Sequence, residues 1–457
     1  MSTASAGTAD TRLTLTFAER LLELSSTESE PRLQAHAQSH LLNALALAVG
    51  ASDHPAVQGA IRLGSTVGGR PTAPVPGTRT ALDAQYAALA TGVGAHLDDF
   101  DDTHLATVIH PSATTMAAAF ALGVTRGVDG PTLLRAFTLG CEAQLRVGLA
   151  LGPSHYDAGW HSTGTCGVLG AAVAGGVVVG LDAPRLAMAI GIAASSTVGQ
   201  REGFGTMLKA LHTGKAAANG VLAVLLAESG FTGSSRVLEA PRGFLSVFSN
   251  TVDQSQVLTE LGSTWAFSDN TVKPYPCGIV IHPVIDAGLE LSQRIPNPRQ
   301  ISAVTVRCNP LVTDLTGITQ PQDGLQARFS AAHGLAAALI DGSVGLPAYT
   351  TKRVRDSQLA HLRQTISLAP DPTCPRDAAS VTVTLTDGRS FVSDVLHARG
   401  SQSRPPTAAE VRTKADALIR PLLGERADQL PAAVETLPSA GDLVALVNSL
   451  TPTEEIA

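Results

Sequence analysis

The chain has 457 residues, of which 44% are hydrophobic but only 4% aromatic, and it contains 43 glycines. This length allows two or three domains, and an apolar content dominated by small residues is typical of closely packed helices rather than of a β-sandwich. The net charge of −7, from 32 basic and 39 acidic residues without a basic run, argues against a protein that binds nucleic acid.

The first part of the chain, residues 1–268, is predicted to be an all-helical domain. Apolar residues recur there at three- and four-residue spacing, and glycine or proline stands at most junctions. We expect helices at residues 16–24, 33–49, 81–97, 113–123, 132–148, 167–179, 185–195 and 215–229. No stretch of this part alternates for long enough to predict a strand.

Residues 269–399 have a different pattern, which predicts a smaller α+β domain. Residues 301–308 alternate between apolar and polar side chains, as a strand does. Residues 380–396 alternate on both sides of Asp387-Gly388, a dipeptide typical of a hairpin turn. The segment between them at 327–340 has helical spacing.

The last part, residues 400–457, is predicted to return to helix and to pack back on the first domain. It begins with a proline-containing linker at 401–406. Thr407 and Glu410 then have the spacing of a capping box, which opens a helix that we expect to continue through Leu423. The whole pattern predicts a mainly α fold with a large all-helical domain and a smaller α+β domain.

Three features bear on where the protein works. Residues 1–10 lack a basic region followed by an apolar run, so we expect no signal peptide. The longest apolar run, at 167–181, is shorter than the roughly 20 residues that cross a bilayer, so we expect a buried helix and a soluble protein without membrane contact. The five cysteines are scattered and lack CxxC spacing, which favours a reducing cytoplasm over disulfides or structural zinc.

Residues 99–110 hold three aspartates and two histidines in a chain in which only 16% of residues are charged. Such crowding indicates proton transfer, a metal site or a polar cap. A calcium-binding EF-hand loop is excluded, because His104 stands where glycine is needed and His110 where glutamate is needed. A hard-metal site built from the three aspartates and a histidine stays open, as does a solvated acidic loop with structural histidines.

Two histidines directly precede predicted helices. His110 is followed by Pro111-Ser112 and the helix at 113–123, and His161 stands ahead of the helix at 167–179. A helix N-terminus attracts anions, and an imidazole beside it can exchange a proton with a bound acid. A structural role fits His161 alone equally well, but the repeated arrangement favours a carboxylate-binding pocket.

Two lysines are further candidates, and no nucleotide motif accompanies them. Lys209 occupies the position of the first glycine of a phosphate loop that would end at Gly214-Lys215, so the motif fails. If this segment is helical, Lys209 and His212 share a face. The lysine is then either catalytic or a structural residue whose ammonium group extends to solvent. Lys273 lies in a proline-rich loop at the domain junction, a common place for ligands. Cys277 nearby lacks the surroundings of a nucleophile.

Four separated segments resemble the MmgE/PrpD family, which includes 2-methylcitrate dehydratase, cis-aconitate decarboxylase and iminodisuccinate epimerase. They read Asp99-x-Asp-Asp-Thr103 with His110-Pro-Ser, His161-Ser-Thr-Gly-Thr, Gly205-Thr-Met-x-Lys209-x-x-His212-x-Gly, and Lys273-Pro-Tyr-Pro. The resemblance implies that the α+β domain is a lid on the helical domain and that the protein is a homodimer. It also implies acid–base chemistry on a small di- or tricarboxylate in the cleft, with no metal and no organic cofactor.

The resemblance also implies roles for individual residues. The expected catalytic residues are Asp99, His110, His161, Lys209 and Lys273. The expected substrate-binding residues are Asp102, Thr103, His212, Tyr275 and His333. In these roles His110 or His161 is the general base, Asp99 orients the site, and the two lysines hold the substrate carboxylates and stabilise developing negative charge.

Two departures bear on the choice of reaction. Gly278 stands where the decarboxylase branch has a histidine, and His333 stands where that branch has a tyrosine. We therefore expect a lyase that dehydrates a 2-methylcitrate-like acid, with decarboxylation and epimerisation as the alternatives within the family. Outside it, the alternatives are a non-catalytic binding protein, which the intact positions argue against, and a metal-dependent hydrolase.

Overall fold

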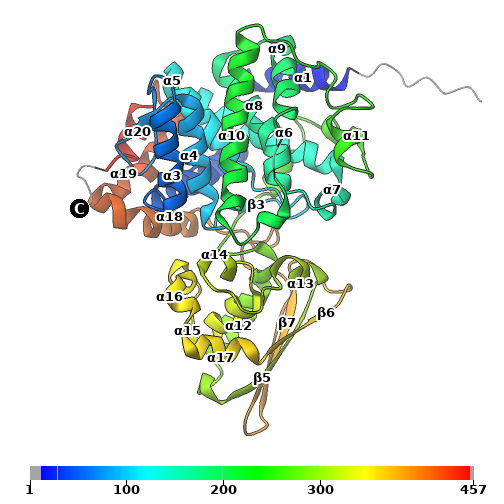
Figure 1. Ribbon diagram of the computed structural model, residues 1–457, viewed down its shortest axis with the longest axis vertical. Coiled ribbons are helices and arrows are strands. Elements are labelled where there is room, and N and C mark those ends of the chain that lie inside the picture. Colours follow the sequence, from blue (N-terminus) through cyan, green and yellow to red (C-terminus); the bar gives the residue numbers. More distant parts are fainter. Residues whose placement is uncertain (1–11, 28, 198, 453–457) are drawn as a thin grey trace, which may run out of the picture.

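The computed structural model describes residues 12–27, 29–197 and 199–452, and its fold is mainly α (Figure 1). Two hydrophobic cores organise it. Buried residues between Leu13 and Phe267, joined by others between Ala415 and Leu450, form the first core, and the residues around it are called the helical part. The second core lies between Tyr275 and Leu385, and the residues around it are called the α+β part.

The helical part contains most of the long helices. Those before the α+β part are α1 (Leu13–Ser25), α2 (Pro31–Gly50), α3 (Pro55–Val67), α4 (Ala84–Leu97), α5 (Pro111–Arg126), α6 (Gly130–Leu151), α7 (Pro153–Asp157), α8 (Ser162–Val179), α9 (Ala183–Ala194), α10 (Met207–Glu228) and α11 (Phe244–Phe248). Each of the eight predicted helices is confirmed, with ends shifted by several residues. Two short ladders also occur here, β1 (Ala73–Pro74) with β2 (Ala81–Leu82) and β3 (Asp102–Thr103) with β4 (Thr271–Val272).

Glycines let the central helices come close together. Gly92 of α4 and Gly214 of α10 face each other, and a Cβ added at Gly92 would lie 2.8 Å from the Cα of Gly214. A larger residue at either position would push the two helices apart. This contact matters for the site, because α4 leads into Asp99 and α10 carries Lys209 in its first turn.

Two helices, Ser162–Val179 and Met207–Glu228, are long and apolar enough to cross a membrane. Their apolar windows are 89% and 72% buried inside the structure, as in core helices that contact other helices rather than lipid. The prediction that residues 167–181 belong to a buried helix is confirmed for residues 167–179.

The α+β part is built on a four-stranded sheet with the order β6-β5-β7-β8. β5 (Ile301–Cys308) pairs in parallel with β6 (Ile366–Pro370) and antiparallel with β7 (Ala379–Leu385), and β7 pairs antiparallel with β8 (Ser390–Val395). The turn between β7 and β8 contains Asp387-Gly388, with Gly388 at φ 86°. The predicted strand and hairpin are confirmed.

Helices cover one face of this sheet, and β5 and β7 alternate between buried and more exposed residues accordingly. The helices of this part are α12 (His282–Ser292), α13 (Pro310–Thr316), α14 (Gly324–Ala327), α15 (Ala331–Asp341), α16 (Thr351–Val354) and α17 (Ser357–Gln364), of which α12, α13 and α17 contact the strands. The prediction of a single helix at 327–340 is wrong in one respect, because the helical conformation is interrupted between α14 and α15. Ser330 caps α15 by accepting a hydrogen bond from the backbone N–H of His333.

The C-terminal segment packs on the helical part. It forms α18 (Ala408–Leu423), α19 (Gln429–Thr436) and α20 (Val444–Ser449), and α18 packs on α2. The capping box is confirmed: the Glu410 backbone N–H donates to Thr407 Oγ1 at 3.2 Å, and the Thr407 N–H donates to Glu410 Oε2 at 2.8 Å. Residues of all three helices belong to the first core.

Candidate active site

The Asp99 loop is held by a ladder to a distant segment. α4 ends at Leu97, and Asp99 has a φ of 48°, which a residue other than glycine adopts only at some cost. Asp102 and Thr103 then pair with Val272 and Thr271. The next residue after that ladder, Lys273, donates its backbone N–H to the Asp101 carbonyl at 3.1 Å. The ladder therefore brings Lys273 beside Asp99.

Asp99 lies between two lysines. Its Oδ1 accepts hydrogen bonds from Lys209 Nζ and Lys273 Nζ, both at 2.8 Å, and Lys273 Nζ also donates to the Asp99 carbonyl at 3.1 Å. Lys273 is only 1% exposed and Lys209 only 7%. Burial alone would raise the pKa of Asp99, but the two ammonium groups hold it well below its usual range. Asp99 is a buried carboxylate at the centre of the cluster.

Asp101 and His96 extend the cluster. Asp101 Oδ2 accepts from His96 Nδ1 at 2.6 Å, and the other imidazole nitrogen, Nε2, accepts from Lys209 Nζ at 2.8 Å. Burial is the largest cause that lowers the pKa of His96, to about 4, so the ring is neutral near pH 7. Sequence reasoning missed His96. The signal was a histidine three residues before Asp99, at the end of the predicted helix.

The tautomer of His110 follows from its partners. Its Nδ1 lies 2.8 Å from the Asp102 carbonyl oxygen and 3.0 Å from Thr103 Oγ1. A carbonyl oxygen only accepts, so Nδ1 carries a proton, and Nδ1 also lies 3.3 Å from Asp101 Oδ1. The backbone N–H of His110 donates to Thr163 Oγ1 at 3.1 Å, which ties the start of α5 to the start of α8. The ring contacts all involve Nδ1, which leaves Nε2 as the ring nitrogen of His110 that could contact a ligand.

His161 offers the second available ring nitrogen. Its Nδ1 lies 3.2 Å from His212 Nδ1, whereas its buried Nε2 has no hydrogen-bond partner among the residues that the structure describes. Burial, reinforced by Lys209 and the neighbouring histidines, holds the pKa of His161 well below its usual range. The ring centroids of His110 and His161 are 6.2 Å apart, close enough for one small ligand to contact both. The predicted shared pocket for these two histidines therefore fits the geometry.

The cavity beside these groups is nearly closed. It measures only about 10 Å³ and is bordered by Asp99 and Lys209 from the helical part and by Arg328 and Phe329 from the α+β part. Arg328 Nη2 contacts Asp98 Oδ1 at 2.5 Å, so an ion pair joins the two parts at its rim. A cavity of roughly 10–15 Å³ holds about one water, so the cluster has no room for a polycarboxylate in this arrangement.

Three predicted substrate-binding residues have other partners. Asp102 is fully buried, and its Oδ2 accepts from His40 Nδ1 and Asn270 Nδ2, both at 2.7 Å. Tyr275 donates its hydroxyl to Asp286 Oδ1 at 2.5 Å. Both ring nitrogens of His333 are engaged in the α+β core, one by the Ala348 carbonyl at 2.9 Å and one by Arg363 at 3.1 Å. These contacts argue against direct substrate contacts by the three side chains, whereas Thr103 and His212 lie within the cluster.

The donor set of the cluster does not fit a divalent cation. Two groups of possible ligand atoms each lie within 4.8 Å of one another. One comes from His96, His110 and His161, and the other from His96, Asp99, Asp101 and His110. However, two ammonium groups already lie 2.8 Å from Asp99, and they would repel a metal ion placed among these donors. Cys277 is also excluded as a nucleophile, because burial raises its pKa to about 12.

Comparison with known proteins relates both parts of the chain to one family. Residues 16–256 match the MmgE/PrpD N-terminal domain, and residues 275–437 match the MmgE/PrpD C-terminal domain. A cis-aconitate decarboxylase of Mus musculus is 28% identical over 411 residues, which cover 84% of this chain and 81% of the relative. The Homo sapiens enzyme of the same name is 28% identical over 414 residues, or 86% and 84% of the two chains. One from Aspergillus terreus is 28% identical over 278 residues, or 56% and 57%.

Proposed function

The chain belongs to the MmgE/PrpD family, and we propose that it is a carboxy-lyase that decarboxylates a small unsaturated tricarboxylate of the cis-aconitate type. The observation that carries the proposal is the buried cluster in which Asp99 holds two lysines beside the imidazoles of His110 and His161. Relatives that match most of this chain are named cis-aconitate decarboxylases, which favours this reaction over the dehydration expected from the sequence.

Of the two residues that favoured dehydration, His333 no longer supports that choice. The ring of His333 is enclosed in the α+β core, so its identity bears little on the chemistry at Asp99. Gly278 donates its backbone N–H to the Arg328 carbonyl at 3.1 Å and has no side chain to reach a substrate. Dehydration of a 2-methylcitrate-like acid therefore stays the second candidate, supported by Gly278 alone.

The proposed mechanism needs cations and one proton donor. Lys209 and Lys273 would hold two substrate carboxylates. When the third leaves as CO₂, the electrons of the breaking C–C bond form a new double bond, and the old double bond takes up a proton at its far carbon. A substrate anion raises the pKa of a nearby histidine, so His161 or His110 becomes protonated on binding and delivers that proton. We propose that this chemistry uses no metal and no organic cofactor.

The proposal includes a movement of the α+β part. We propose that residues 269–399 form a lid on a helical domain made of residues 1–268 and 400–457. A cavity of about 10 Å³ cannot admit a tricarboxylate, and we propose that the Arg328–Asp98 ion pair breaks when substrate enters. Closure would then exclude water from the lysines and strengthen their hold on the anion.

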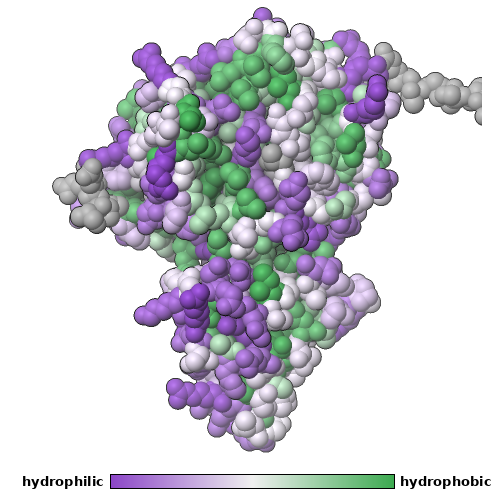
Figure 2. Space-filling view, in the orientation of Figure 1, coloured by the Kyte–Doolittle hydropathy of each residue, from purple (hydrophilic) through white to green (hydrophobic). Residues whose placement is uncertain are grey.

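We further propose a homodimer that works in a reducing cytoplasm. The family resemblance and the five free, buried cysteines support these two points. Exposed apolar side chains of α10 offer a surface for a second copy, since Leu208 and Leu211 are 51% and 40% exposed. Figure 2 shows apolar surface over the middle of the helical part, where α10 runs in Figure 1. Sedimentation of the wild type and of Leu211→Glu tests the dimer.

One experiment tests the reaction. Purified protein is incubated in D₂O with cis-aconitate, 2-methylcitrate or iminodisuccinate, and the products are followed by NMR. We expect loss of CO₂ from cis-aconitate and incorporation of one deuterium into the product. Water loss from 2-methylcitrate without turnover of cis-aconitate would replace decarboxylation by dehydration. No reaction with any of the three would favour a non-catalytic binding protein.

A further inference from the structure

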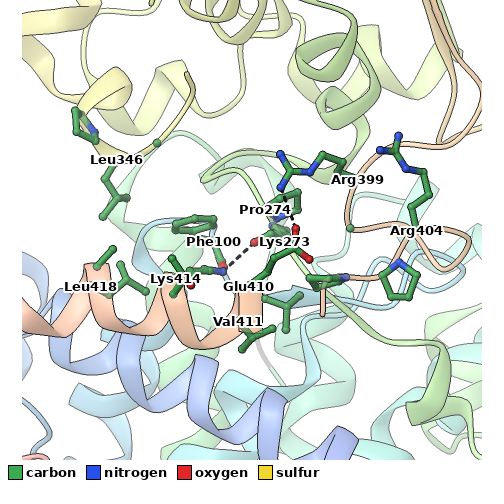
Figure 3. A pocket seen from close by; sticks show the side chains of 18 residues that line it. Phe100, Lys273, Pro274, Leu346, Arg399, Arg404, Glu410, Val411, Lys414 and Leu418 are labelled. Atoms are coloured by element: carbon green, nitrogen blue, oxygen red, sulfur yellow. Dashed lines mark hydrogen bonds and ion pairs between the residues drawn. The ribbon is translucent and has the colours of Figure 1, made fainter. Parts of the chain in front are cut away.

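A larger cavity lies beside the cluster and shares Lys273 with it. It measures about 670 Å³, and its walls come from α18, the loop at 345–347, the loop at 399–406 and the Lys273-Pro274 segment (Figure 3). None of its lining residues borders the small cavity beside Asp99. Binding sites for small organic molecules commonly measure about 300–1,000 Å³, so this cavity has the size of a ligand site.

The lining is apolar at one end and cationic at the other. Leu346 and Leu418 lie at one end of the cavity, whereas Arg399 and Arg404 lie at the other (Figure 3). Arg399 pairs with Glu410 at 3.2 Å. The guanidinium of Arg404 donates to the His397 carbonyl at 3.0 Å and has no acidic partner among the residues that the structure describes. The cationic end therefore carries an excess of positive charge.

Lys414 stands between the two ends and is also without an acidic partner. Its ammonium donates to the carbonyl oxygens of Phe100 and of Lys273, the latter at 2.9 Å, and it lies 3.6 Å from the centroid of the Phe100 ring. Within the described parts of the chain, no carboxylate forms an ion pair with it. Burial lowers the pKa of Lys414 well below its ordinary value, and an anion bound beside it would favour the charged form of the side chain.

We propose that this cavity binds an amphipathic organic anion and that its occupancy is coupled to the active-site cluster. The carboxylate or sulfonate of the ligand lies near Lys414 and Arg404, and its apolar body lies against Leu346, Leu418 and the Phe100 ring. Lys273 borders both this cavity and the proposed substrate site, but the proposal does not depend on the reaction assigned there.

The coupling runs through Lys414. Phe100 lies between Asp99 and Asp101, and Lys273 carries the second ammonium on Asp99. Lys414 therefore joins the two backbone segments that position the cluster. An anion that draws Lys414 toward the cavity weakens the hydrogen bonds from Lys414 to these carbonyl groups. The backbone amides at 98–104 and 271–275 then become less protected from hydrogen exchange.

Binding is tested on the full chain with the fluorescent anion 8-anilinonaphthalene-1-sulfonate. We expect saturable one-site binding, displaced by sodium octanoate but not by octylamine. Ala417→Trp fills the cavity from an exposed position of α18 and should weaken binding at least tenfold while leaving basal activity unchanged. Lys414→Gln should weaken it as well. Arg412→Gln removes the same charge from α18 at a residue that does not line the cavity, so it should leave the affinity unchanged.

Several outcomes would overturn the proposal. Equal affinity of the wild type and Ala417→Trp would place the probe elsewhere, and equal displacement by octylamine would remove the case for an anion. The coupling is measured by hydrogen–deuterium exchange with and without octanoate. We expect faster exchange at 98–104 and 271–275 in the wild type but not in Ala417→Trp. Binding that leaves exchange of these segments unchanged would refute the coupling.

Discussion

Replacing Asp99 by asparagine tests whether the cluster is held together by charge. The substitution leaves the ammonium groups of Lys209 and Lys273 buried near each other, both within 2.8 Å of the side chain that has lost its charge. Removal of one partner from a buried ion pair destabilises a protein by about 3–5 kcal/mol. We expect the free energy of unfolding of Asp99→Asn to fall by about this amount, as measured by urea denaturation.

A second substitution provides the matched control. Lys273→Met alone should also lower the free energy of unfolding, because it leaves Asp99 with one cation and removes a side chain that is 1% exposed. The double variant Asp99→Asn/Lys273→Met keeps Lys209 and Asp101 as one cation and one anion. The decrease in its free energy of unfolding should therefore be smaller than the sum of the two single decreases, by about 0.5–3 kcal/mol. The fluorescence of the two tryptophans reports unfolding.

The pH dependence has a definite sign. The pKa of Asp99 in the folded protein lies well below its usual value of 3.8. Its contribution to stability is therefore fully present above about pH 4 and is lost as the pH falls through the folded pKa. The stability difference between the wild type and Asp99→Asn should stay constant from pH 8 to pH 5 and shrink below pH 4. Additive losses in the double variant, or an Asp99→Asn protein as stable as the wild type, would refute the reasoning.

His161→Gln should remain folded but lose deuterium incorporation from D₂O into the product, because glutamine cannot exchange a proton near neutral pH; retained incorporation, seen by NMR, would move the role to His110. Exhaustive dialysis against EDTA should leave turnover unchanged, and a loss of activity that a divalent ion restores would contradict the cofactor-free mechanism. Iodoacetamide at pH 8 should not label Cys277 of the native chain, since burial raises the pKa of that thiol to about 12; rapid labelling in a mass spectrum would contradict its burial.

Features set by neighbours in sequence were predictable. The spacing of apolar residues located the long helices, and the pair Thr407 and Glu410 marked the start of α18 because a capping box involves only four consecutive residues. The Asp387-Gly388 turn fixed the hairpin of β7 and β8 for the same reason. Each of these structures is decided mainly by contacts within a few residues.

Features set by distant partners were not predictable from spacing. Asp102 resembles its neighbours in the acidic loop, yet its carboxylate is bound by His40 and Asn270, which lie far away in the sequence. The two-residue ladder of β3 and β4 is too short to leave a pattern of alternation. The family resemblance located Asp99 and the two lysines in the sequence, but only the fold shows that one carboxylate oxygen holds both ammonium groups.

The charge balance of the closed cluster explains how histidines with low pKa values can act as acids. Asp99 and Asp101 balance Lys209 and Lys273, and burial keeps His96 and His161 neutral, so the cluster carries no net charge from these groups. A tricarboxylate that enters must compete with Asp99 for the lysines, and it adds negative charge in a site that excludes water. That charge is offset when a histidine takes up a proton, because an adjacent anion raises the pKa of an imidazole. The substrate thus recruits the proton that its own reaction consumes.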